Sequence, residues 1–190
     1  MKRILRDNCV ASALTAAILI FCCAVLLLQA HDPRTTAKTF SHSLDIEGAG
    51  QFGLTYKAMH FNEPVYKRMQ TEEALRDRIN ANVWNAIGKA DVGFEIAAAD
   101  QAIPKGKYGF GLNIEPNEGF TVVFKTSEKT IKVPLHVTKE NPDVAYLTFA
   151  IFPTDKPDTF VLEGRCGKYR GTADLKVPYL AEHTHPAAGK

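Results

Sequence analysis

Two histidines and one glutamate are the side chains of this chain that are best suited to metal binding or acid–base chemistry. His60 and Glu63 are three residues apart where an alternating segment ends, and His136 lies in a later alternating segment. Imidazole and carboxylate groups are common ligands of divalent metals. The three residues predict a metal-binding or enzymatic site if the fold brings them together. Otherwise His136 is a solvated residue on the polar face of its strand.

A second set of residues is suited to binding an organic ligand. Trp84, the sole tryptophan, is followed by Asn85, and a Trp beside an amide can stack on a sugar ring or an apolar ligand. Together with Tyr108 and His60, these residues are our candidate ligand-binding set. The alternative for Trp84 is a hydrophobic plug at the end of the core.

Two glycines, Gly109 and Gly111, leave one face of a predicted strand without side chains. Such a bare face permits the close approach of a ligand or of another part of the backbone. The sequence leaves both interpretations open.

Motifs typical of catalysis are missing from the sequence. It contains no phosphate-cradling glycine loop, no serine nucleophile elbow and no paired cysteine ligands. Cys166 is the one cysteine outside the first thirty residues, and its neighbours Arg165 and Lys168 supply cations but no activating base. We therefore predict an unreactive thiol, assign no catalytic residue, and expect no cofactor unless His60, Glu63 and His136 hold a divalent metal.

Apolar and polar residues alternate over most of the chain beyond residue 40. The alternating segments are 52–58, 92–96, 108–114, 120–124, 131–137, 147–151 and 173–177. Strict alternation predicts strands with one buried and one solvated face, and their short spacing predicts an all-β fold, an antiparallel β-sandwich. Pro134 cannot donate a ladder hydrogen bond, so its strand is expected at a sheet edge or a bulge.

One short helix is expected within this sandwich. Thr71 is the predicted N-cap, and Glu72 to Ile79 is the predicted helix, with Leu75 and Ile79 on one face. The helix interrupts the sandwich and does not indicate a second domain.

The first thirty residues predict export. Lys2, Arg3 and Arg6 precede an unbroken apolar run from Cys9 to Leu28. A run of about 20 residues is long enough to cross a bilayer as a helix, and the preceding positive charges place its far end outside the cytoplasm. Residues 1–30 are therefore a cleaved signal peptide or an N-terminal hydrophobic helix that anchors the protein in the membrane. The chain is expected on the periplasmic or extracellular side.

The remainder of the chain has the size of one domain. We assign 31–39 to a linker, 40–180 to the β-sandwich domain and 181–190 to a flexible tail. His42, close to the linker, is expected to be solvated. The formal net charge of the 190-residue chain is +2, which does not indicate a nucleic-acid partner.

Parts of the chain resemble an exported bacterial family known as domain of unknown function 2911. The resemblance is carried by residues 83–90, 92–96, 103–110 and 120–124. It departs at Asn85, where the family has Arg, and at Ile87-Gly88-Lys89, where the family has Gly-Ala-Asn. Members have no established activity, so the resemblance implies an exported bacterial protein and not a reaction.

These observations favour a non-catalytic binding module of the bacterial cell envelope, with an unidentified envelope ligand or protein as its partner. The first alternative is the metal-binding or enzymatic site around His60, Glu63 and His136. The second is a protein-interaction module that works through an exposed edge strand, such as the strand of Pro134.

Overall fold

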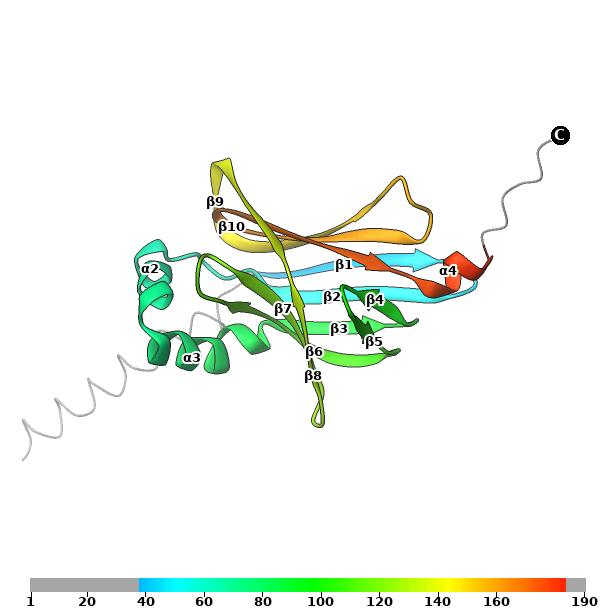
Figure 1. Ribbon diagram of the computed structural model, residues 1–190, viewed down its shortest axis with the longest axis horizontal. Helices are drawn as coiled ribbons and strands as arrows, with labels where there is room; N and C mark the ends of the chain where they lie inside the picture. Colours follow the sequence, from blue (N-terminus) through cyan, green and yellow to red (C-terminus); the bar gives the residue numbers. More distant parts are fainter. Residues whose placement is uncertain (1–37, 184–190) are drawn as a thin grey trace, which may run out of the picture. The chain divides into compact units, whose positions relative to one another are not determined.

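The computed structural model describes residues 38–183, which form two antiparallel β-sheets accompanied by few helices (Figure 1). The all-β prediction is therefore confirmed. The strands are β1 (Thr39–Ile46), β2 (Gly50–Lys57), β3 (Gly88–Val92), β4 (Ile96–Ala98), β5 (Gln101–Ile103), β6 (Gly106–Ile114), β7 (Phe120–Lys125), β8 (Thr130–Pro134), β9 (His136–Pro153) and β10 (Thr159–Lys176). The six-stranded sheet has the order β1-β2-β3-β6-β7-β8, and the four-stranded sheet has the order β5-β4-β10-β9.

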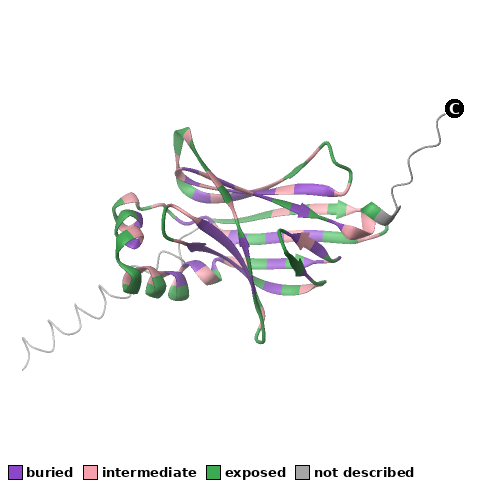
Figure 2. Ribbon diagram, in the orientation of Figure 1, coloured by how far each residue is buried: buried purple, intermediate pink, exposed green. Residues whose placement is uncertain are grey.

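The two sheets pack against each other through aromatic side chains. Phe52 of β2 contacts Phe160 of β10 with ring centroids 5.4 Å apart, and Phe110 of β6 contacts Phe149 of β9 at 4.8 Å. Figure 2 shows buried and exposed positions alternating along β2, β3 and the first half of β6, as expected for strands with one face on a core.

One side of the core is closed by backbone hydrogen bonds between β9 and the segment that follows β2. After β2 the chain continues along the free edge of β9, where the N–H of Leu147 donates to the carbonyl of Met59 at 2.8 Å. The N–H of Phe61 donates to the carbonyl of Ala145 at 2.9 Å. These bonds satisfy backbone groups of β9 that an open edge would leave to solvent.

The prediction of one continuous strand over 92–96 was wrong. β3 ends at Val92 in the six-stranded sheet, and β4 begins at Ile96 in the four-stranded sheet. At the crossing, the N–H of Gly93 donates to the carbonyl of Gln51, and a Cβ on Gly93 would lie 2.5 Å from that same oxygen. Glycine is therefore required for this close approach.

The expected position of Pro134 is confirmed. It ends β8, which is an edge strand of the six-stranded sheet. Leu135 follows, and its N–H donates to the carbonyl of Phe120 before β9 begins at His136 in the other sheet. The predicted strand 131–137 is thus divided between the two sheets.

A helix is present over most of the predicted Glu72 to Ile79, but it is not single and Thr71 is not its N-cap. The structure has two helices before β3, α2 (Glu63–Thr71) and α3 (Glu73–Asn82), followed by the short 3₁₀ helix η1 (Trp84–Ala86). The side chain of Asn62 caps α2 by accepting from the N–H of Val65 at 3.0 Å. Glu72, and not Thr71, separates the two helices.

α3 is fixed to the six-stranded sheet by a side-chain amide that forms the two backbone hydrogen bonds a neighbouring strand would form. The buried side chain of Asn80 donates to the carbonyl of Ile114 at 2.9 Å and accepts from its N–H at 3.0 Å. Both backbone groups of this β6 residue are satisfied, so α3 and η1 are held against one end of the sheet (Figure 1).

Several predicted boundaries shift. β1 begins at Thr39, inside the predicted linker, and the short helix α4 (Pro178–His183) extends into the predicted tail. Residues 1–37, which include the predicted signal peptide or anchor, and residues 184–190 lie outside the described part of the chain. No helix within residues 38–183 is long and apolar enough to span a bilayer.

Candidate functional site

The structure brings His60 and Glu63 to the same hollow. His60 is exposed just after β2, where its ring meets that of Tyr146 edge to face at 5.4 Å. Glu63 begins α2, and its carboxylate lies 3.1 Å from Lys67 Nζ and 4.0 Å from Lys168 Nζ. His60, Glu63 and Lys168 line a hollow of about 310 Å³. Glu63 is thus engaged by ammonium groups at this hollow.

His136 lies away from that hollow. It pairs with Thr172 of β10, whereas Val144, which lines the hollow, pairs with Gly167. Gly167 and Thr172 are five positions apart along β10, a distance of about 17 Å. Within residues 38–183, no group of three or more His, Cys, Asp or Glu residues is placed to hold a metal ion. The three residues of the predicted metal site therefore do not converge.

Trp84 lies in the hydrophobic core with 7% of its surface exposed. This placement favours the core plug over the ligand platform. Asn85 is half-buried, and its Oδ1 has no hydrogen-bond partner among the described residues. Trp84 and Asn85 together cover Gly111 of β6, because a Cβ on Gly111 would lie 2.6 Å from the carbonyl oxygen of Trp84.

Tyr108 is buried, and its hydroxyl donates to the carbonyl of Pro104 at 2.6 Å. Its ring meets that of Phe124 edge to face at 6.0 Å. Burial raises the pKa of this tyrosine above its usual range. The Tyr108 side chain is therefore committed to the core and to a turn.

Cys166 is buried with 4% exposure, and burial raises the pKa of its thiol to about 12. The thiolate is the reactive form of cysteine. The geometry thus agrees with the unreactive thiol predicted from the sequence.

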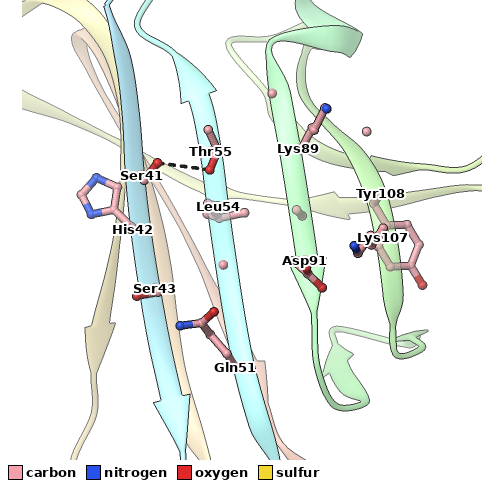
Figure 3. A pocket seen from close by; sticks show the side chains of 14 residues that line it. Ser41, His42, Ser43, Gln51, Leu54, Thr55, Lys89, Asp91, Lys107 and Tyr108 are labelled. Atoms are coloured by element: carbon pink, nitrogen blue, oxygen red, sulfur yellow. Dashed lines mark hydrogen bonds between the residues drawn. The ribbon is translucent and has the colours of Figure 1, made fainter.

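A larger hollow lies elsewhere, on the outer face of the six-stranded sheet (Figure 3). Its volume is about 860 Å³. Gly53 of β2 and Gly109 of β6, which lie on the outward-facing positions of their strands, contribute no side chains to it. Beyond Gly109 the same face is covered by η1 at Gly111. Of the two glycines singled out in the sequence, Gly109 therefore opens onto the hollow and Gly111 packs against backbone.

Polar side chains from four strands surround this floor. Ser41 of β1 and Thr55 of β2 are joined by a 3.1 Å hydrogen bond between their hydroxyls (Figure 3). The strand register aligns Thr55 with Lys89 of β3, and Lys89 with Gly109. The neighbouring register row runs Ser43, Gly53, Asp91, Lys107. The β1–β2 side of the hollow is thus hydroxylated, and the β3–β6 side is charged.

This outer sheet face carries an excess of positive charge. Five lysines and two aspartates on its strands project outward in alternation with the buried positions: Lys57, Lys89, Lys107, Lys125, Lys132, Asp45 and Asp91. Lys89, Lys107 and Asp91 are exposed and form no ion pair with another residue of the described chain. Their charges are therefore available to a ligand.

The residues around this hollow offer hydrogen bonding and charge, and they do not form a nucleophile–base pair. The hydroxyls of Ser41 and Thr55 are bonded to each other, while the one lining histidine, His42, stacks on Tyr56 with ring centroids 6.0 Å apart. His42 is half-buried, contrary to the expectation that it is solvated. The arrangement is suited to binding.

Sequence reasoning singled out Gly109 of this site but missed the polar side chains around it. Their signal was present in the polar positions that alternate with the core residues of 52–58 and 108–114, but which of them become neighbours depends on strand order. No family model, curated protein or solved structure matches the chain.

Proposed function

We propose that this chain is an exported or membrane-tethered bacterial envelope domain that acts as a non-catalytic binding module. Export is supported by the basic start and the apolar run of the leader. The two packed sheets support a β-sandwich as the scaffold. The ligand site of this module is the hollow on the outer face of the six-stranded sheet.

The observation that carries the proposal is a hollow of about 860 Å³ with glycines in its floor and, beside it, charges that form no ion pair within residues 38–183. Ligand sites are typically concave and of this volume, with a few polar groups that fix orientation. Gly53 and Gly109 lie in strands with ordinary backbone angles, and a Cβ at either position would find no heavy atom closer than 3.5 Å. The packing of the fold therefore does not require glycine at these positions. A ligand that approaches the sheet surface does require it, because a side chain there would fill the hollow.

A filling experiment tests the site. The purified full-length chain is screened by thermal shift against oligosaccharides, divalent metal salts and envelope lipids. A ligand at a hundred times its Kd adds about 2.7 kcal/mol of stability, which raises Tm by several degrees for a domain of this size. Gly53→Trp and Gly109→Trp place an indole in the hollow and are expected to abolish the shift.

Lys176→Trp is the matched control, because Lys176 is exposed on β10 in the other sheet. It adds the same indole at a distance from the hollow and is expected to leave the shift unchanged. A ligand whose shift survives both glycine substitutions would overturn this site. A shift confined to metal salts and lost in His60→Ala would support the metal site instead.

The edge-strand alternative receives less support from the structure. β8 is an edge strand, yet it ends in Pro134 and projects Lys132 outward. Proline and lysine on an edge strand are features that oppose pairing with another chain. β8 is therefore protected against the strand addition that this alternative requires.

A further inference from the structure

We infer that the ligand of this hollow is an anionic polysaccharide, one whose sugar rings carry carboxylate, sulfate or phosphate groups. The inference rests on the proposed function and names the ligand class of the same site. It follows from three features of the hollow, namely the spacing of its lysines, the polar groups opposite them and the side chains that are absent from its lining.

The lysines form a spaced array across the strands. Lys89, which lines the hollow, and Lys125, which lies just outside its lining, belong to one register row, with Gly109 between them. Adjacent strands are about 4.8 Å apart, so the two lysines are about 10 Å apart across the sheet. Lys107 lies in the next row on the intervening strand. This array presents separate cations along an extended path, which fits a polymer with repeated negative charges better than a single compact anion.

The opposite side of the hollow offers neutral hydrogen-bonding groups. Ser41, Ser43 and Thr55 contribute hydroxyls, and Gln51 contributes an amide (Figure 3). Each hydroxyl both donates and accepts, and the amide provides two donors and an acceptor. Sugar hydroxyls have the same dual character. A ligand that satisfies both sides of the hollow therefore combines acidic groups with many hydroxyls.

The lining lacks the side chains that single-stranded nucleic acids or bilayers require. The two large apolar side chains among the lining residues, Leu54 and Tyr108, are buried on the core side of the sheet. Single-stranded nucleic acids bind by stacking bases on exposed aromatic rings, and peripheral membrane binding requires exposed apolar side chains that insert between lipids. Neither is available among the residues that line this hollow, so charge and hydroxyl groups decide the ligand class.

The test compares an acidic with a neutral polysaccharide. The full-length chain is titrated by calorimetry with alginate, which carries a carboxylate on every sugar, and with dextran, which carries none. We expect alginate to bind and dextran to bind at least about tenfold more weakly, which corresponds to about 1.4 kcal/mol. Because the lysines are exposed, alginate affinity should fall as salt is raised.

A charge-matched pair of variants separates this site from general attraction. Lys89→Ser with Lys107→Ser removes two cations beside the hollow, while Lys156→Ser with Lys176→Ser removes two exposed cations elsewhere. The net charge of the two double variants is identical. The first is expected to lose about tenfold in alginate affinity, and the second to stay within about twofold of the unmodified chain.

The outcomes distinguish the ligand class from the site. If dextran binds as tightly as alginate and Gly53→Trp abolishes both, the binding module stands and the anionic ligand is overturned. Equal losses in the two double variants would also overturn it, because attraction would then depend on net charge alone. If neither polysaccharide binds, or if single-stranded DNA or anionic lipid vesicles bind more tightly than alginate, the inference fails. Absence of any ligand sensitive to Gly53→Trp would remove the proposed function as well.

Discussion

The hydroxyl of Tyr56 on β2 forms two hydrogen bonds with one residue of the opposite sheet, Phe149 on β9. It donates to the carbonyl at 2.9 Å and accepts from the N–H at 2.8 Å. The ring of Tyr56 also meets the ring of Phe149 edge to face at 5.2 Å. Met59 and Phe61 bond to the backbone of β9 along the edge that faces away from β10. The Tyr56 hydroxyl continues this row of hydrogen bonds from within the core.

Tyr56→Phe is expected to lower the free energy of unfolding by about 2–4 kcal/mol. The substitution keeps the ring but leaves a buried N–H and a buried C=O without partners, and each such group costs about 1–3 kcal/mol. Urea denaturation measures the loss. Tyr108→Phe is the matched control, since its hydroxyl serves only the Pro104 carbonyl in a partly buried turn, and it should cost about 1 kcal/mol. Equal losses in the two variants would contradict a special role for the Tyr56 hydroxyl.

Two glycines of the six-stranded sheet should respond in opposite ways to the same substitution. A Cβ at Gly111 would lie 2.6 Å from the Trp84 carbonyl and 2.7 Å from the Asn85 backbone, so Gly111→Ala must displace η1. We expect a loss of more than about 2 kcal/mol, comparable to overpacking in a core. Gly53→Ala meets nothing closer than 4.0 Å and should be neutral or stabilising by about 0.5–1 kcal/mol.

Thermal unfolding of the two alanine variants measures both effects. A large loss in Gly53→Ala would mean that this position is needed for packing, and the open floor of the hollow would then need another explanation. A neutral Gly111→Ala would show that η1 is not held against β6 as closely as the structure has it.

The sheet pattern could be predicted because alternation is a local property. The segment 108–114 alternates without interruption, the segment 120–124 has an apolar residue at every second position, and both are strands, β6 and β7. The crossing at Gly93 could not be predicted, because the period of two continues through it while the partner strands change. Helix α2 was missed although Asn62 and Pro64 are start signals that the structure uses.

The candidate site depended on distant pairing, which local patterns do not contain. Lys89 and Lys107 line the same hollow only because β3 pairs with β6. In the sequence these two strands are separated by β4 and β5, which belong to the other sheet. His60 and His136 occupy comparable positions next to strand ends, yet β9 carries them apart. Residue type identified chemically capable side chains, whereas strand order decided which of them meet.

The acid sensitivity of the fold should depend in part on Glu118. A hydrogen bond from Lys139 lowers the pKa of its carboxylate, with help from the hydroxyl of Tyr169 and the charge of Lys168. A carboxyl with a lowered folded-state pKa stabilises the fold above its unfolded pKa of about 4.3, and this contribution disappears as pH falls through the lower folded value.

Glu118→Gln removes this contribution. The difference in unfolding free energy between the unmodified chain and the variant should be constant above about pH 5 and shrink towards zero below about pH 4. Urea denaturation across this range measures it. Glu128→Gln is the control, because Glu128 is exposed between β7 and β8 and forms no ion pair with another described residue. A difference that does not change with pH would exclude ionisation of Glu118 as its cause.

Cys166 should be protected from alkylation for as long as the fold is intact. Its thiol is buried and its pKa is raised to about 12, so at pH 8 almost no thiolate forms and reagent has no access. In the unfolded chain the pKa returns to about 8.5 and the thiol reacts normally. Iodoacetamide labelling of the full-length chain, read on the peptide that contains Cys166, should therefore follow the unfolded fraction as urea is raised. Cys166→Ser, labelled in parallel, measures how much label is attached to other residues of that peptide. Labelling of Cys166 in the absence of urea at the rate of a free thiol would contradict the burial on which this prediction depends.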